Sequence, residues 1–310
     1  MYKIKKTFAV SAPLRLSLAG GGTDLPEYYL KSETKLLSVA INERINIVCG
    51  KNIQHDSSEL TNLFQQKCHG YNVKVESNIN PGNGLGGSGA LAVALVAAQN
   101  HVNNISKSPL DIALEAYYWE RNILNKSVGF QDQVASAYGG CTEMRAFPNG
   151  KIEAFKRDDL IKPLDNLLQK NLIFVETNQN RDADNLLKKL AKSFDEIGTK
   201  KLNPADFNDV ENVILEENER DFGKLLKAHW ENKKKRLESS TTEKIDEIIN
   251  YAENQGALGA KVIGAGGGGF ILLCASDKNK NNLCKKLLNS GYTIREYKVD
   301  QNGIILKELL

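Results

Sequence analysis

Long hydrophobic runs are absent from this chain of 310 residues, in which no stretch of 18 consecutive apolar residues occurs. A helix that spans a membrane needs about 20 such residues. The first residues carry three lysines and lead into an apolar stretch, which superficially resembles a secretion signal, but Pro13 and Arg15 interrupt it. The sequence therefore predicts a cytoplasmic protein with no membrane partner.

Paired cysteines and a dominant charge are lacking as well. The five cysteines are odd in number and show no C-x-x-C spacing, so we expect ordinary thiols and no metal site at Cys68-His69. The 41 basic and 38 acidic residues leave a net charge of +3, too balanced for a protein that binds nucleic acid or membrane surfaces. One dense basic run, residues 233–236, is typical of a solvated helix face, with an anion-binding role as the alternative.

The residue patterns predict an α+β protein with two domains and no internal repeat. We expect strands near residues 7–18, 36–49, 71–77 and 171–177, on both sides of 264–269, and at 292–299 and 303–308. We expect helices near residues 90–98, 108–122, 183–200, 206–236, 241–255 and 278–290, with a further short helix that ends at Gly139-Gly140. The character of the chain changes near residue 165, which predicts an N-terminal domain at 1–168 and a C-terminal domain at 169–310.

A glycine-rich loop lies between a predicted strand and the apolar helix that starts near Ala90. Five glycines in eight residues let backbone N–H groups converge on an anion, and a helix N-terminus adds partial positive charge. A flexible turn is the alternative, and the helix start favours a phosphate site. The predicted phosphate-binding residues are Pro81, Gly82, Asn83, Gly84, Leu85, Gly86, Gly87, Ser88 and Gly89.

Two common phosphate loops do not fit this segment. The spacing Gly84-x-Gly86-x-x-Gly89 matches a dinucleotide-binding pattern, but a second helix follows where that fold needs a strand ending in an acid. Ala90 stands where a P-loop requires lysine. The sequence therefore indicates a phosphate site of another kind.

Four side chains could serve phosphoryl transfer at this loop. Ser88 suits Mg²⁺, which prefers oxygen ligands, although a helix N-cap is the alternative role. Glu120, at the end of the preceding helix, could reach the same ion. Asp132, in the first turn of a short helix, is a candidate base, with a plain helix-terminal charge as the alternative. Arg15 could orient Asp132, lower its pKa and neutralise charge on the phosphoryl group.

A second glycine run, Gly264–Gly269, lies between two predicted strands. A tight hairpin seldom needs four consecutive glycines. Close backbone approach to a ligand or to the facing domain explains them better.

The ordered set of Pro13-x-Arg15 leading to Asp24, the loop Pro81–Ala90 and the run Gly264–Gly269 closely resembles the GHMP kinase superfamily. The resemblance spans nearly the whole chain. It implies an N-terminal domain like domain 2 of ribosomal protein S5 and a ferredoxin-like C-terminal domain, with ATP between them. Within the superfamily the sequence is most similar to D-glycero-D-manno-heptose 7-phosphate kinases, through segments that include 16–24, 84–88, 131–133 and 138–140, with Glu120-Arg121, Thr177-Asn178-x-x-Arg181 and Trp230-x-x-Lys233.

This resemblance implies a Mg²⁺- and ATP-dependent kinase that phosphorylates the anomeric hydroxyl of a sugar or sugar phosphate, for the synthesis of nucleotide-activated heptose. Asp132 would act on that hydroxyl with the help of Arg15, while Ser88 and Glu120 would hold Mg²⁺. Arg181 and Lys233 are candidates for the phosphate of the acceptor, with plain surface charge as the alternative. The predicted substrate-binding residues are Gly21, Gly22, Thr23, Asp24, Gln131, Arg181, Lys233, Gly266 and Gly267.

Departures from the family pattern leave other functions open. Gly87 replaces a common serine, and the region between the first two motifs is shorter than expected for a heptose kinase. Galactokinases and mevalonate kinases typically carry Glu-His at Gly21-Gly22, which argues against both of their substrates. The alternatives are a kinase for a fucose- or galactose-like sugar, an ATP-dependent decarboxylase and a non-catalytic ATP-binding sensor. A homodimer is among the oligomeric states that the sequence leaves open.

Overall fold

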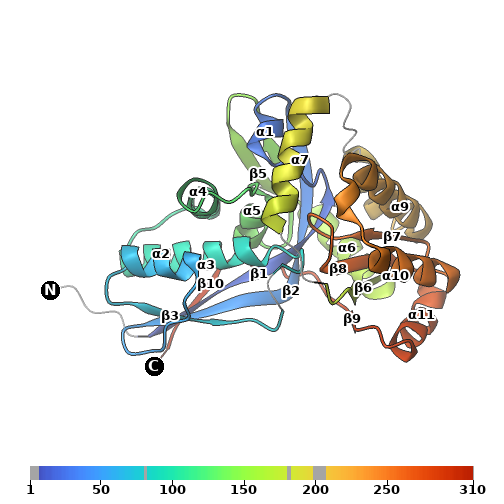
Figure 1. Ribbon diagram of the computed structural model, residues 1–310. Coiled ribbons are helices and arrows are strands. Elements are labelled where there is room, and N and C mark those ends of the chain that lie inside the picture. The colour runs from blue at the N-terminus through green and yellow to red at the C-terminus, as the bar shows by residue number, and fades with distance from the viewer. Residues whose placement is uncertain (1–6, 80–81, 180–182, 198–206, 310) are drawn as a thin grey trace.

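Figure 1 shows the computed structural model, which describes residues 7–79, 82–179, 183–197 and 207–309. The described strands form one sheet of six strands and one of four, and helices pack against both. This arrangement confirms the α+β class. In the described part of the chain, no helix has both the length and the apolar composition needed to cross a membrane.

The larger sheet is antiparallel and has the order β10-β1-β2-β4-β5, with β3 paired to β2. Alternation of Leu14, Leu16 and Leu18 with polar residues produces the expected first strand. Its register against β2 shifts next to Pro13, which has no N–H to donate. The strands are β1 (Phe8–Ala19), β2 (Thr34–Gly50), β3 (Asn72–Glu76), β4 (Cys141–Ala146), β5 (Ile152–Lys156) and β10 (Ile305–Glu308).

One helix packs directly on the larger sheet and carries the glycine-rich loop at its start. This is α3 (Gly87–Val102), whose small apolar side chains are buried on nearly all sides, as the sequence predicts. Small side chains let it approach β1, β2, α4 and α5 closely. The other helices of this half are α1 (Pro26–Tyr29), α2 (Glu59–Lys67), α4 (Pro109–Tyr118), the π-helical turn η1 (Trp119–Ile123) and α5 (Gln131–Tyr138).

The smaller sheet has the order β7-β8-β6-β9. A hydrophobic core separate from that of the larger sheet forms here. In it, α9 and α10 cover β7 and β8, and α11 covers β6 and β9. The strands are β6 (Leu172–Glu176), β7 (Gly259–Val262), β8 (Phe270–Cys274) and β9 (Ile294–Arg295). The helices are α6 (Asp158–Lys170), α8 (Phe207–Leu215), α9 (Glu219–Arg236), the 3₁₀ turn η3 (Glu238–Ser240), α10 (Glu243–Asn254) and α11 (Asp277–Asn289).

Three local expectations differ from the structure. The helix expected over 206–236 is broken, because Glu217 adopts a positive φ of 49° and the side chain of Asn218 caps a new helix, α9. The strand expected over 292–299 is shortened to Ile294–Arg295. Helices α2 and α6 were not expected from the sequence.

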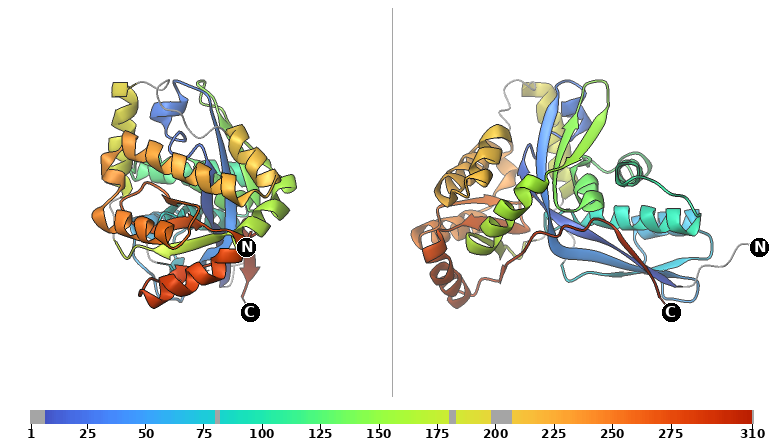
Figure 2. Two further views of the ribbon diagram at one scale, coloured as in Figure 1. Left: turned by 90° about the vertical axis from the view of Figure 1, so that its right-hand side faces the viewer. Right: turned by 180° about the vertical axis from the view of Figure 1, so that it is seen from behind.

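The last strand crosses from one half of the molecule to the other. β10 pairs with β1, and Figure 2 shows the C-terminal segment running back from the smaller sheet to the larger one. The sheets change over between α6 and β6, close to the boundary expected at residue 168, which stays a prediction.

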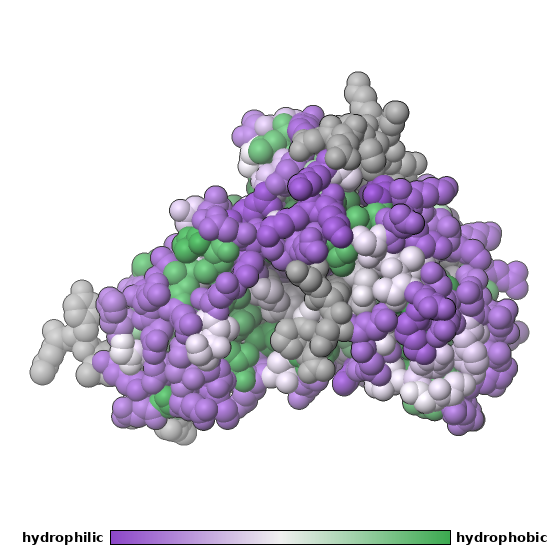
Figure 3. Space-filling model, viewed as in Figure 1, coloured by the Kyte–Doolittle hydropathy of each residue, from purple (hydrophilic) through white to green (hydrophobic). Residues whose placement is uncertain are grey.

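A further helix, α7 (Ala183–Ile197), lies beside α1 at the upper edge of the molecule. Leu25, Tyr28, Ala191 and Phe194 form a small hydrophobic cluster there, in which the rings of Tyr28 and Phe194 lie 5.2 Å apart. A helix from the second half of the chain thus packs on the first half. Hydrophilic side chains cover most of this face of the molecule (Figure 3).

Candidate active site

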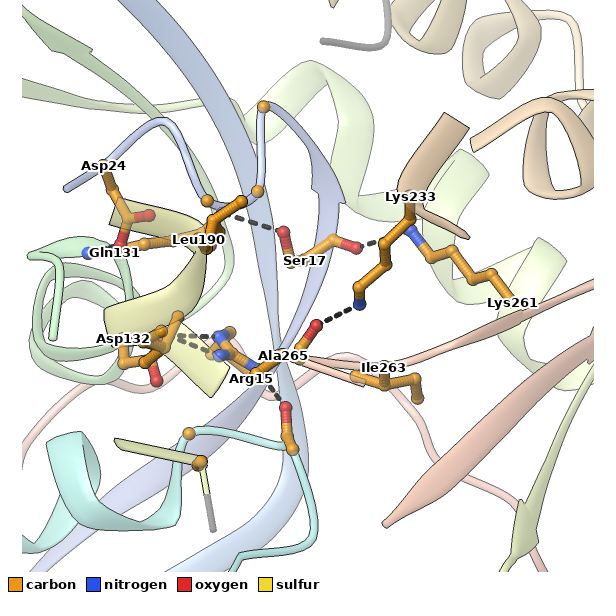
Figure 4. A pocket seen from close by; sticks show the side chains of 18 of the residues that line it. Arg15, Ser17, Asp24, Gln131, Asp132, Leu190, Lys233, Lys261, Ile263 and Ala265 are labelled. Carbon is orange, nitrogen blue, oxygen red and sulfur yellow. Dashed lines mark hydrogen bonds and ion pairs between the residues drawn. The ribbon is translucent and has the colours of Figure 1, made fainter. Parts of the chain in front are cut away.

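A pocket is lined by residues from both halves of the chain (Figure 4). One wall comes from β1, the turn Gly20–Gly22, the glycine-rich loop and α5. The opposite wall comes from the C-terminal part of α9, and from β7 with the loop that follows it, while α7 closes the side of the pocket next to the turn Gly20–Gly22. We refer to these as the N-terminal wall and the C-terminal wall.

The centre of the N-terminal wall is an ion pair between Arg15 and Asp132. Arg15 Nε donates to Asp132 Oδ1 at 2.7 Å, and Nη2 lies 2.5 Å from the same oxygen. Arg15 Nη1 donates to the carbonyl of Gly84 at 2.6 Å, and its backbone N–H donates to Leu85 at 2.9 Å. The buried arginine thus joins β1, the glycine-rich loop and α5, while the Asp132 side chain stays 31% exposed to the pocket.

At two positions of the loop, Gly86 and Gly89, the backbone conformation or the packing requires glycine. Gly86 is the N-cap of α3 with φ +80°, so Ser88 lies inside the first turn and is not the cap. A Cβ on Gly89 would lie 2.7 Å from Asp132 Cβ, because α3 and α5 touch at this point. Gly87, in contrast, has nothing within 4 Å of its Cβ position. The first turn of α3 therefore borders the pocket with free backbone N–H groups, which suits an anion.

Ser88 and Glu120 lie together at the base of this wall. Ser88 Oγ donates to Glu120 Oε1 at 2.5 Å, and Gln133 Nε2 donates to Glu120 Oε2 at 2.6 Å. Glu120 is 1% exposed. Burial, and to a lesser degree the charge of Asp132, raises the pKa of Glu120 to about 7, although both hydrogen bonds oppose the rise.

This pair has the oxygen chemistry that Mg²⁺ prefers. The described residues contain no group of three or more His, Cys, Asp or Glu side chains that could hold a metal ion by themselves. Mg²⁺ usually takes only one or two protein oxygens and completes its shell with water and phosphate. Glu120 is a buried carboxylate that no cation of the described residues contacts, which fits such a site, so Ser88 and Glu120 could hold the ion together with ATP.

Asp24 enters the pocket after the turn Gly20–Gly22. The backbone N–H of Gln131 donates to Asp24 Oδ2 at 3.3 Å, and a Cβ on Gly129 would lie 2.0 Å from that oxygen, so glycine is required there. Burial, followed by the Asp132 charge, raises the pKa of Asp24 to about 6. Gln131 Nε2 donates to Ser17 Oγ at 2.9 Å, which fixes the amide beside the carboxylate.

Comparison with known protein families identifies the family to which the chain belongs. The family model described as GHMP kinases N terminal domain matches residues 51–140, and the one described as GHMP kinases C terminal matches residues 211–293. Together the two matches cover more than half of the chain. The chain belongs to the GHMP kinases. GHMP kinases use ATP, so the protein is an ATP-dependent phosphotransferase.

Individual GHMP kinases resemble the chain along its length. A D-glycero-alpha-D-manno-heptose 7-phosphate kinase of Campylobacter jejuni is 25% identical, over 96% of this chain and 98% of that protein. A solved D-glycero-D-manno-heptose 1-phosphate kinase from Bacteroides thetaiotaomicron has a TM-score of 0.71 at 21% identity and covers 98% of this chain and 99% of its own. A galactose complex of Lactococcus lactis galactokinase has a TM-score of 0.70 at 15% identity, over 99% and 96% of the two chains. These structural likenesses support the GHMP kinase fold.

The remaining predicted residues of this GHMP kinase fall into three groups. Gly21, Gly22 and Lys233 line the pocket. Thr23 is fully buried and donates to the carbonyl of Gly20, so it shapes the turn without facing the pocket. Pro81 and Arg181 lie outside the described residues. Lys233 donates to the carbonyls of Val262 and Gly264, which ties α9 to the second glycine run.

Only the start of the second glycine run lines the pocket, and later glycines of the run pack against backbone atoms of other segments. Gly264 and Ala265 line the pocket. A Cβ on Gly266 would lie 2.7 Å from the carbonyl of Ser240, to which the N–H of Gly267 donates at 2.6 Å. A Cβ on Gly269 would lie 2.1 Å from the carbonyl of Asn83 in the phosphate loop. Of the two expected partners, ligand or facing domain, Gly269 thus approaches the facing half, whereas Gly266 and Gly267, predicted to bind substrate, do not line the pocket.

Several residues that line the pocket were not expected from the sequence. Leu187 and Leu190 of α7, Ser17 of β1, and His229 and Lys261 of the C-terminal wall belong to this set, whereas Arg236, which also lines the pocket, is part of the basic run for which anion binding was the alternative. Lys261 gave one signal that could have revealed it, since it is a charged residue within the otherwise apolar strand at 260–263.

Proposed function

We propose that this GHMP kinase transfers the γ-phosphoryl group of ATP to the anomeric hydroxyl of a sugar or sugar phosphate, with D-glycero-D-manno-heptose 7-phosphate as the acceptor. The Arg15–Asp132 pair carries the proposal, because it holds a carboxylate between the phosphate loop and the pocket that Asp24 enters. The heptose kinases named above support the choice of acceptor.

In this proposal the backbone N–H groups at the start of α3 bind the ATP phosphates. Arg15 lies beside the same loop and offsets the charge that develops on the transferring phosphoryl group. Phosphoryl transfer depends mainly on positioning and charge compensation, which are what these groups supply. Mg²⁺, held by Ser88 and Glu120, would neutralise phosphate charge further.

The acceptor oxygen attacks the γ-phosphorus while the bond from that phosphorus to the β–γ bridging oxygen breaks, which releases ADP. The hydroxyl proton passes to Asp132, whose contacts with Arg15 use Oδ1. Asp24 and the side-chain amide of Gln131 orient the other hydroxyl groups of the sugar, since both lie beside Asp132 on the same wall.

An assay of ADP release with Mg-ATP over a panel of sugars and sugar phosphates tests this function. The expected result is turnover with heptose 7-phosphate and a product that carries a new phosphate at the anomeric carbon, identified by ³¹P NMR. Turnover only with fucose- or galactose-like sugars would replace the acceptor. Release of CO₂ would replace the reaction by decarboxylation, and ATP binding without ADP release across the panel would indicate a sensor. The cytoplasmic location and a homodimer stay predictions.

A further inference from the structure

The C-terminal wall carries two cations that contact no carboxylate of the described residues. Lys261 of β7 donates through Nζ to the carbonyl of Ser17 at 2.9 Å, and Arg236 of α9 donates through Nε to the carbonyl of Asn232 at 3.3 Å. Within the described residues, neither side chain forms an ion pair. Both are partly buried and both line the pocket, where Lys261 lies on the side opposite Asp24 and Asp132 (Figure 4).

Other buried or partly buried cations of the molecule contact carboxylates. Lys280, which is 4% exposed, lies 2.5 Å from Glu296. Arg44 lies 2.5 Å from Asp300, and Arg157 contacts three carboxylates, those of Glu143, Asp159 and Glu211. These three buried or partly buried cations each contact at least one carboxylate, whereas Lys261 and Arg236 contact none among the described residues.

Without a counter-charge, the charged forms of these two side chains are destabilised in the free protein. Burial and the charge of Arg15 lower the pKa of Lys261 to about 8, and burial also lowers the pKa of Arg236. His229 lies beside them, and burial together with Lys261 and Arg236 lowers its pKa to about 3, so it stays neutral. Its Nε2 is buried and has no hydrogen-bond partner among the described residues. Two cations and a neutral imidazole around one space form a site that an anion would complete.

We propose that Lys261 and Arg236 form a second anion subsite, which binds the phosphate that the acceptor itself carries. The inference rests on the proposed function and names the part of the site that selects a phosphorylated acceptor. Ser17, which Lys261 contacts, lies two residues beyond Arg15 on β1 and also holds Gln131, so the subsite adjoins the sugar-binding part of the pocket. The reacting hydroxyl at Asp132 and the phosphate at Lys261 would then lie at opposite ends of one extended sugar phosphate.

The four residues of the basic run 233–236 make different contacts, which assigns them different roles. Lys233 donates to the carbonyls of Val262 and Gly264 and so holds the start of the second glycine run in place. Arg236 instead lines the pocket and forms no ion pair with the described residues. Lys234 pairs with Glu231, and Lys235 is exposed. Lys235 therefore offers a control with the same loss of charge from the same helix end.

Steady-state kinetics of Lys261→Met, Arg236→Met and the control Lys235→Met test the subsite with heptose 7-phosphate and with the unphosphorylated heptose. A charged hydrogen bond contributes about 1.5–3 kcal/mol, so we expect each pocket variant to raise KM for the sugar phosphate roughly 10–100-fold. KM for ATP and the weak turnover of the unphosphorylated sugar should stay within about twofold, as should every parameter of the control. A rise in KM for ATP would assign the cations to the nucleotide, and equal losses with both sugars would assign them to structure; either result overturns the proposal.

A binding measurement separates failure of the subsite from failure of the proposed reaction. Inorganic phosphate is titrated calorimetrically into protein saturated with a non-hydrolysable ATP analogue, which occupies the phosphate loop. Binding to the wild type that Lys261→Met abolishes and Lys261→Arg retains would support the subsite even if no heptose is phosphorylated. Equal binding by wild type and Lys261→Met, with both proteins folded by thermal denaturation, would overturn it.

Discussion

The two walls of the pocket differ in how their charges are satisfied. On the N-terminal wall each acid has protein partners: Arg15 for Asp132, Ser88 and Gln133 for Glu120, and the N–H of Gln131 for Asp24. On the C-terminal wall, the hydrogen bonds of Lys261 and Arg236 to the described part of the chain go to backbone carbonyls. The difference indicates that the first wall is arranged before any ligand arrives, as a catalytic wall must be. The second wall is completed by the ligand and therefore selects it.

The largest effect is expected when the charge on the N-terminal wall is removed at its centre. Asp132→Asn keeps the size of the side chain but cannot accept the hydroxyl proton, so kcat should fall roughly 10²–10⁴-fold with little change in KM for ATP. Coupled ADP release measures it. Asp111→Asn, at an exposed position in the first turn of α4, is the matched control and should retain wild-type kcat. Turnover by Asp132→Asn near that of the control would contradict the role of Asp132.

Glu120 links this wall to protein stability through pH. Its pKa in the folded protein is about 7, above its ordinary value of 4.5, so folding favours the protonated form and stability falls as pH rises from 4.5 through 7. Glu120→Gln removes this penalty, because the amide can still accept from Gln133 and donate to Ser88. We expect the variant to exceed the wild type in unfolding free energy by on the order of 3 kcal/mol at pH 8, and by little at pH 4.5.

Denaturant unfolding of both proteins in the presence of a metal chelator, at several pH values, measures this difference. The same substitution should lower kcat, because the variant loses the carboxylate proposed for Mg²⁺. A stability difference that is independent of pH would show that Glu120 does not titrate in this range.

The contact between α3 and α5 can be tested with two glycines of the same helical turn. Gly89→Ala would place a Cβ 2.7 Å from Asp132 Cβ, so the variant should lose about 1–3 kcal/mol of unfolding free energy. Gly87→Ala meets nothing within 4 Å and should keep or slightly increase that free energy. Thermal unfolding of the two variants measures the contrast, and equal stability would mean that α3 and α5 are less closely packed.

The smallest effect is expected from the C-terminal wall as pH rises. The pKa of Lys261 is lowered to about 8, so its charge, and with it the binding of the acceptor phosphate, should be lost above that pH. The groups that face it are Arg15 on β1 and His229 and Arg236 on α9, and His229, whose pKa is lowered to about 3, stays neutral over this range. KM for the sugar phosphate should rise about 10-fold from pH 7 to 9, following the charged fraction of a lysine with that pKa. Lys261→Arg should flatten this dependence, whereas an unchanged slope would exclude Lys261 as its source.

Local patterns were enough to predict much of this fold. Alternation predicts β1, uniform small apolar residues predict the buried α3, and glycines at the start of α3 predict a loop that opens on the pocket. Arg15 and Asp132 were expected to meet, and the structure places them in contact. The class of the chain as a GHMP kinase is confirmed, whereas the roles of the individual side chains stay predictions.

Properties that depend on distant contacts could not be predicted. Nothing in the sequence around Ile305 indicates that β10 pairs with β1, because strand pairing depends on packing elsewhere in the chain. The sequence offers only weak signals for Lys261, a charge within an apolar strand, and for Arg236, part of a basic run, whereas their lack of ion pairs among the described residues is visible only in the fold. The break before α9 depends on a single left-handed residue, Glu217, at which the helical pattern of the sequence continues.

The return of the chain to β1 limits how the two halves of the molecule can move. In the described part of the chain the strands change from one sheet to the other twice, once after α6 and once between β9 and β10. The N–H of Val299 in the second passage donates to Asp165 Oδ1 of α6 at 3.0 Å, so the two passages are fastened to each other. They therefore act as one pivot. We expect any opening of the pocket to turn about this point, against the resistance of α7, which packs on α1 of the other half.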